Sequence, residues 1–98
     1  MKLIFEWDIG KAKSNLRKHK VGFEEAKEVF LDDFAVTFRD ERYSKDEERF
    51  IIIGKSSEHR TLLVVHTERD SFENSVIIRI ISCRKATKAE RAIYEKVE

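Results

Sequence analysis

The stretch VIIRIISCRKATKAERAIY, residues 76–94, contains both of the hydrophobic periods from which this fold can be predicted. Its first half is a run of apolar, largely β-branched residues, which predicts a strand over residues 76–84. Thr87 and Glu90 then have the S/T-x-x-E spacing of a capping box, which predicts a helix over residues 86–98. The apolar stripe of that helix would consist of Ala89, Ile93 and Val97.

Periodicity elsewhere in the chain predicts four more strands and two more helices. Asp8 and Gly22 are suited to cap helices that end near residues 18 and 31. The additional strands are expected at residues 2–7, 34–40, 49–56 and 61–69. Short polar connections such as RYSKDEE and DSFENS fit hairpins. The predicted class is therefore α+β, in the order β-α-α-β-β-β-β-α, with a mostly antiparallel sheet of four to five strands, two N-terminal helices and one C-terminal helix.

Length and composition limit the possible classes of protein. The 98 residues, 41% of them apolar, suit one domain over residues 1–98. The single cysteine, Cys83, cannot form an internal disulfide, which favours a reducing compartment. The sequence has no secretory signal pattern and no apolar run long enough to cross a membrane, so we expect a cytoplasmic protein. Neither a Gly-rich phosphate loop nor a metal-ligand pattern is present, so we expect no metal and no cofactor.

The charges are unevenly distributed, although the net charge is only +1. Residues 11–20 contain five Lys and Arg and no acid, whereas residues 32–48 contain seven acids and three bases. Residues 79–91 contain five bases and one acid. A near-neutral total therefore does not exclude binding to a polyanion at one face.

The predicted last strand has an arginine within an apolar run. Strict alternation places Arg79 on the same face as Ile77, Ile81 and Cys83. A guanidinium there must find a carboxylate, reach solvent, or line a cleft that receives an anion. Arg84 and Lys85 immediately precede a helix N-terminus, which attracts phosphate, although a plain helix-entry role is also possible.

Two further side chains could transfer protons. His66 is predicted to share a face with Glu68, which could orient its imidazole, although a lone strand-end histidine is usually a boundary residue. Tyr94 could donate to a phosphate or pack against the sheet. His19 stands at a basic helix end, where a solvated role is expected. A Ser-His-Asp arrangement is not apparent.

Three motifs in this order resemble the BrnT family of toxins from type II toxin-antitoxin systems. They are W-D-x-x-K-x-x-x-N-x-x-K-H (residues 7–19), ERF-x-x-x-G (48–54) and R-I-I-S-x-R-x-A-T (79–87). The similarity covers almost the whole chain. Two departures are Lys20, where the family usually has Gly, and Gly22, where it usually has Ser. The turn between the two N-terminal helices is therefore expected to be built differently here.

The resemblance implies a RelE-like fold and an RNA endonuclease that stops growth. It also implies a BrnA-like antitoxin with a ribbon-helix-helix domain, and operator DNA bound only through the complex with that antitoxin. RNA cleavage without a metal needs proton transfer and cations around the phosphate.

On this hypothesis each candidate residue has a role. Arg79, Arg84 and Lys85 would supply the cations, and His66 would transfer the proton with Glu68 as orienter or base. Tyr94 is a secondary candidate for the reaction. The residues expected to position RNA are Lys18, Arg49 and Arg69. Two alternatives stay open: a non-catalytic module that binds nucleic acid or protein, and a purely structural subunit.

Overall fold

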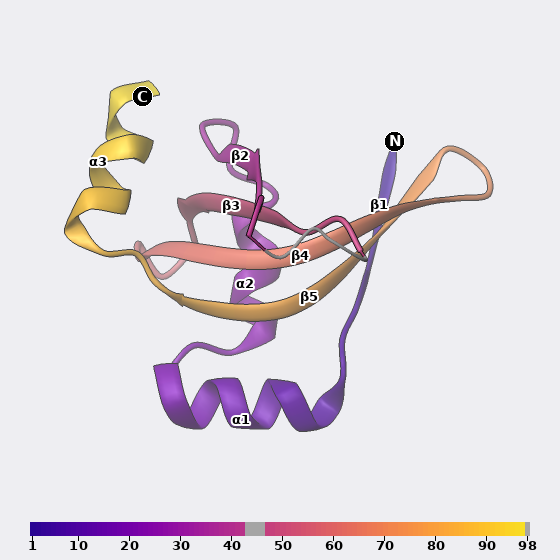
Figure 1. Ribbon diagram of the computed structural model, residues 1–98, viewed down its shortest axis with the longest axis horizontal. Helices are drawn as coiled ribbons and strands as arrows, with labels where there is room; N and C mark the ends of the chain where they lie inside the picture. The colour runs from indigo at the N-terminus through magenta and orange to yellow at the C-terminus, as the bar shows by residue number, and fades with distance from the viewer. Residues whose placement is uncertain (43–46, 98) are drawn as a thin grey trace.

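The computed structural model describes residues 1–42 and 47–97 and shows one mixed sheet with helices on both of its faces (Figure 1). The predicted α+β class and the predicted element order are confirmed. The elements are β1 (Lys2–Glu6), α1 (Ile9–His19), α2 (Phe23–Val29), β2 (Val36–Arg39), β3 (Phe50–Lys55), β4 (Thr61–Ser71), β5 (Ser75–Lys85) and α3 (Lys88–Val97). The predicted loop at residues 42–48 falls partly on residues 43–46, which lie outside the described residues.

The sheet order is β1-β5-β4-β3-β2. Strands β2 to β5 form the expected antiparallel meander, whereas β1 pairs with β5 in parallel and reaches only from Lys2↔Ser75 to Glu6↔Arg79. Beyond Arg79, the outer side of β5 therefore faces helix α1 instead of a strand (Figure 1). The β4–β5 hairpin is longer than predicted, because its turn takes up only residues 72–74.

A β-bulge interrupts the pairing of β4 with β5. Val65 is opposite Ser82 and His66 is opposite Ile80, so Ile81 is an extra residue in β5. The bulge corrects the strict alternation expected for this strand. Cys83 lies in the same buried core as Ile80 rather than on the face of Arg79, because one additional residue reverses the direction of every later side chain.

The two faces of the sheet have separate hydrophobic cores. The larger core lies under α1 and α2 and includes Val21, Phe23, Ala26, Val29, Leu62, Val64, Ile78 and Ile80. The smaller one joins α3 to the sheet through Tyr94, Ile53 and Leu63. The stripe predicted for α3 is wrong, because Tyr94 is 2% exposed while Ile93 is 45% exposed and Ala89 is exposed. The side chain of Val97 lies outside the description.

The predicted helix caps are present. Asp8 accepts a hydrogen bond from the backbone N–H of Lys11 at 2.8 Å, and Gly22 caps α2 through its backbone. At α3, Glu90 accepts from the N–H of Thr87 at 2.8 Å, and the Thr87 hydroxyl accepts from the N–H of Glu90 at 3.2 Å. The Asp8 and Thr87 side chains thus satisfy N–H groups that have no partner within their helices.

Gly54, the last residue of the ERF-x-x-x-G motif, allows α2 and the turn after it to approach β3. A Cβ atom at this position would lie 2.9 Å from Cγ1 of Val29 and 3.1 Å from the Asp32 carboxylate. This close approach lets Asp32 accept hydrogen bonds from the Lys55 N–H at 2.8 Å and from the Tyr94 hydroxyl at 2.7 Å. Among the described residues, no helix is long and apolar enough to span a membrane.

Candidate functional site

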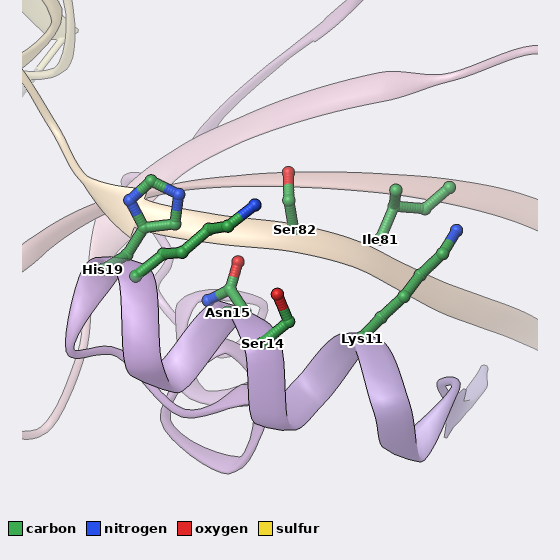
Figure 2. A pocket seen from close by; sticks show the side chains of 7 residues that line it. Lys11, Ser14, Asn15, His19, Ile81 and Ser82 are labelled. Atoms are coloured by element: carbon green, nitrogen blue, oxygen red, sulfur yellow. The ribbon is translucent and has the colours of Figure 1, made fainter.

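A pocket of about 190 Å³ lies between α1 and the bulged half of β5 (Figure 2). Its lining residues are Lys11, Ser14, Asn15, Lys18, His19, Ile81 and Ser82. The five residues from α1 are spaced by three, four or one positions, which places them along one face of the helix. Figure 2 shows the Lys11 side chain extending from α1 toward the strand that carries Ile81 and Ser82.

Asn15 joins the two walls of this pocket. Its side-chain amide donates to the carbonyl of Cys83 at 2.7 Å and to that of Val21 at 3.0 Å, and its oxygen accepts from the N–H of Cys83 at 3.0 Å. The amide thus takes the hydrogen-bonding place of a neighbouring strand at the point where β1 has ended. Asn15 is 6% exposed, so the three bonds are shielded from water and fix α1 against β5.

The cations of this pocket are not neutralised within the fold. Among the residues that the structure describes, no acidic side chain lines the pocket. Within residues 1–42 and 47–97, the side chains of Lys11, Lys18 and His19 form no ion pair or hydrogen bond. All three are exposed. The result is a shallow pocket with two lysine ammonium groups, an imidazole and the Ser14 hydroxyl, which suits an anionic ligand.

Arg79, by contrast, is held in an ion pair. Its Nη1 lies 3.1 Å from Oε2 of Glu6, the residue paired with it on β1. Arg69 binds the same carboxylate through two contacts of 3.0 and 3.2 Å. The hydrogen bonds from Arg69 and Arg79 hold the pKa of Glu6 below its usual value. Two of the predicted cations are therefore already engaged by one carboxylate.

Arg84 is likewise paired, with the carboxylate that caps α3. Its two terminal nitrogens lie 2.8 and 2.9 Å from the two oxygens of Glu90. Arg84 is the main cause that lowers the pKa of Glu90 to about 2. The expected gathering of Arg79, Arg84 and Lys85 at the start of α3 is therefore not formed, because carboxylates engage both arginines. Lys85 is exposed and has no ion pair within the described residues.

His66 and Glu68 lie on the opposite face of the sheet from Arg79. His66 is 0% exposed and packs between the rings of Phe30 and Phe50, at centroid distances of 4.8 and 5.9 Å. Its Nε2 is 2.9 Å from Oε2 of Glu68, so the predicted contact between the two is present. Burial lowers the pKa of His66, and this effect outweighs the opposing hydrogen bond with Glu68. The imidazole is thus closed off from any ligand at the surface.

The remaining predicted residues are dispersed. Tyr94 is buried and donates its hydroxyl proton to Asp32, which fits the packing alternative. Arg49 stands partly buried just before β3, and its carbonyl accepts from the N–H of Asp40. Arg69 lies near the far end of β4. Of the three residues expected to position RNA, only Lys18 lines the pocket on α1.

Six of the seven lining residues were not among the predicted site residues: Lys11, Ser14, Asn15, His19, Ile81 and Ser82. The signal was present in the first motif, since Lys11, Asn15, Lys18 and His19 recur at helical spacing. The missing information was the partner of that helix face, because Ser82 is far away in the sequence. Within the described residues, no three His, Cys, Asp or Glu side chains are grouped in a way that could hold a metal ion.

Comparison with known proteins agrees with the three motifs. Residues 7–90 match the family described as ribonuclease toxin, BrnT, of type II toxin-antitoxin system. The fold is similar to the 1.1 Å crystal structure of the ribonuclease toxin BrnT from Brucella abortus, with a TM-score of 0.63 and 26% identity, covering 90% of this chain and 100% of that chain. No curated protein sequence matches. Because the family match spans most of the chain, the protein belongs to the BrnT family of ribonuclease toxins of type II toxin-antitoxin systems.

Proposed function

We propose that this chain is an RNA endonuclease that needs no metal ion and stops growth by cleaving cellular RNA. We place the scissile phosphate in the pocket between α1 and β5. The observation that carries this assignment is that, within the described residues, the side chains of Lys11, Lys18 and His19 have no carboxylate partner, while Arg79 and Arg84 are paired within the fold. Phosphate is the group in RNA that such a pocket would attract.

The pocket has the chemical groups that RNA cleavage needs. In the proposed reaction the 2′-oxygen attacks the adjacent phosphorus, the bond from phosphorus to the 5′-oxygen breaks, and a 2′,3′-cyclic phosphate and a 5′-hydroxyl result. His19 takes the proton of the attacking hydroxyl, because an imidazole exchanges protons near neutral pH. The ammonium groups of Lys11 and Lys18 stabilise the charge on phosphorus, and one of them protonates the leaving oxygen.

We assign the other predicted catalytic residues mainly to the fold. His66 and Tyr94 are buried and engaged with Glu68 and Asp32, so RNA could reach them only after rearrangement. Arg79 closes an ion pair with β1. Lys85, exposed at the end of β5, remains suited to a phosphate contact next to the pocket.

We also propose the partner that the family relationship suggests. This partner is a BrnA-like antitoxin with a ribbon-helix-helix domain, and the complex binds operator DNA through the antitoxin. The toxin would act in the cytoplasm. Purification of the chain with the product of an adjacent reading frame, followed by a shift assay on the promoter, tests this pairing.

The nuclease assignment predicts a cleavage pattern for single-residue variants. Purified protein is incubated with RNA in EDTA, in parallel with Lys11→Ala, Lys18→Ala and His19→Ala. Removing one well-placed group should reduce the rate roughly 10²- to 10³-fold, because the charge it stabilises develops in the transition state. Single-turnover rates on a short labelled RNA, with analysis of the product ends, provide the measurement.

Lys13→Ala is the matched control, since Lys13 lies on the same helix but does not line the pocket. This variant should cleave RNA at close to the wild-type rate. Retained RNA binding with no cleavage by the wild type would support the non-catalytic module. Equal losses in Lys13→Ala and Lys18→Ala would show that the pocket is not the reaction site.

A further inference from the structure

A second hollow of about 370 Å³ lies on the other face of the sheet, between the strands and α3. Its lining includes Phe38, Ile51, Val65, Ser82, Arg84 and Ile93, and we call it the α3 groove. Ser82 lines both the α3 groove and the pocket on α1. Figure 2 shows the Ser82 side chain pointing away from α1, toward the groove side of β5. The two hollows therefore meet at the β5 edge that β1 leaves uncovered.

The α3 groove combines an apolar floor with polar groups near its junction with the pocket. Ile51 and Val65 are half-buried, while Phe38 and Ile93 keep 40% and 45% of their surface exposed. The polar lining groups are the Ser82 hydroxyl, the carboxylates of Asp40 and Glu90, and the guanidinium groups of Arg42 and Arg84. Glu90 holds the Arg84 guanidinium in place through two hydrogen bonds. This combination suits a flat group with apolar faces and polar edges.

We propose that the α3 groove binds an unpaired nucleobase of the RNA whose phosphate occupies the pocket on α1. This inference rests on the proposed function. The shared residue Ser82 favours a nucleobase as the occupant of the groove. If a phosphate lies in the pocket beside Ser82, the next nucleotide of the same RNA would pass over the edge of β5 into the α3 groove. A base can stack on the Phe38 ring and on Ile93, and its polar edge can form hydrogen bonds with Ser82 and Arg84.

The groove would make single-stranded RNA the preferred substrate. A base held in a duplex is stacked between its neighbours and paired, so it cannot enter a hollow beside the backbone without being unstacked. The competing occupant is an apolar segment of a protein partner. In that case the α3 groove would have no effect on RNA binding, and this is an outcome of the following test.

The test measures binding without cleavage. The probes are a short 2′-O-methyl RNA and a 2′-O-methyl ribose-phosphate oligomer of the same length without bases, so that neither can be cut through its 2′-oxygen. Wild type should bind the base-bearing probe roughly tenfold or more tightly. Phe38→Ala and Ile93→Ala should lose most of this preference and keep their affinity for the abasic probe. Both residues are partly exposed, so the fold should tolerate these changes.

Phe72→Ala is the matched control, because Phe72 is 90% exposed and lines neither hollow. It should keep the wild-type preference. Equal wild-type affinity for the two probes, or an unchanged preference in Phe38→Ala and Ile93→Ala, would overturn the base subsite. Failure of wild type to bind either probe would instead contradict the phosphate pocket, so the two proposals can fail separately. A matching duplex should bind more weakly than the single strand.

Discussion

At the level of single residues, the ionisable groups divide into those engaged inside the fold and those that remain exposed. Arg79, Arg84 and Tyr94 each have a carboxylate partner. The partners of Arg79 and Tyr94 could not be identified from the sequence, because Glu6 precedes Arg79 by 73 residues and Asp32 precedes Tyr94 by 62. The sequence identifies these side chains as candidates, but whether they are free to act depends on tertiary contacts.

Tyr94 provides a direct test of this division. Tyr94→Phe removes the hydrogen bond to Asp32 but retains the buried ring. We expect the free energy of unfolding in urea to fall by about 1–2 kcal/mol, because a half-buried carboxylate loses one donor. The rate of RNA cleavage should stay close to that of wild type. A large loss of cleavage with unchanged stability would instead indicate that Tyr94 takes part in the reaction.

His66 predicts a pH dependence of stability. Burial lowers its pKa below the ordinary value of 6.5, so the unfolded chain binds a proton more readily than the folded one. The contribution of neutral His66 to the free energy of unfolding is fully present above pH 6.5. It is lost as the pH falls from 6.5 toward the pKa of His66 in the folded state. Urea unfolding between pH 7.5 and about 5 should show this loss in wild type, and His66→Gln should show a smaller one. An identical pH dependence in the two proteins would contradict the assignment.

At the level of elements, capping and periodicity were sufficient to predict every helix and strand. Asp8, Gly22 and Thr87 begin their helices as expected, because a cap depends on residues close in sequence. The bulge at Ile81 could not be predicted, since one extra residue leaves the composition of an apolar run unchanged. The parallel pairing of β1 with β5 could not be predicted either. Hairpin spacing gives information only on strands that are neighbours in the sequence, and β1 pairs with a strand far from it in the sequence.

At the turn after α1, one departure from the family pattern places Lys20 where the backbone conformation favours glycine. Lys20 has φ 61° and ψ 28° at the C-cap of α1, in the left-handed region where glycine is favoured. Lys20→Gly should therefore raise the free energy of unfolding by about 0.5–1 kcal/mol, because it removes strain at the Cβ atom. The gain in stability is limited, because glycine gives the unfolded chain more conformational entropy to lose on folding. Thermal or urea unfolding measures the change, and a clear decrease in stability would contradict it.

At the level of the whole molecule, the sequence indicated that basic residues concentrate on one helix. The structure adds that the pocket on this helix opens beside the uncovered part of β5 and has no acidic side chain in its lining, as far as residues 1–42 and 47–97 are concerned. Motif spacing placed Lys11, Lys18 and His19 on one face, but the identity of the opposite wall required the fold. Of this helix face, sequence reasoning named only Lys18 as a site residue, and the second half of the proposed site could not be predicted.

The central claim is that the unpaired cations of this pocket hold RNA phosphate, and the salt dependence of binding tests it most directly. Affinity for a non-cleavable single-stranded RNA is measured at several salt concentrations for wild type, for Lys11→Ala/Lys18→Ala, and for Lys13→Ala/Arg17→Ala. Arg17 and Lys13 share α1 but do not line the pocket. The slope of log affinity against log salt should fall by roughly 1 to 2 in the pocket variant, and by clearly less in the control. Equal slopes in the two double variants, or no change in either, would contradict the account.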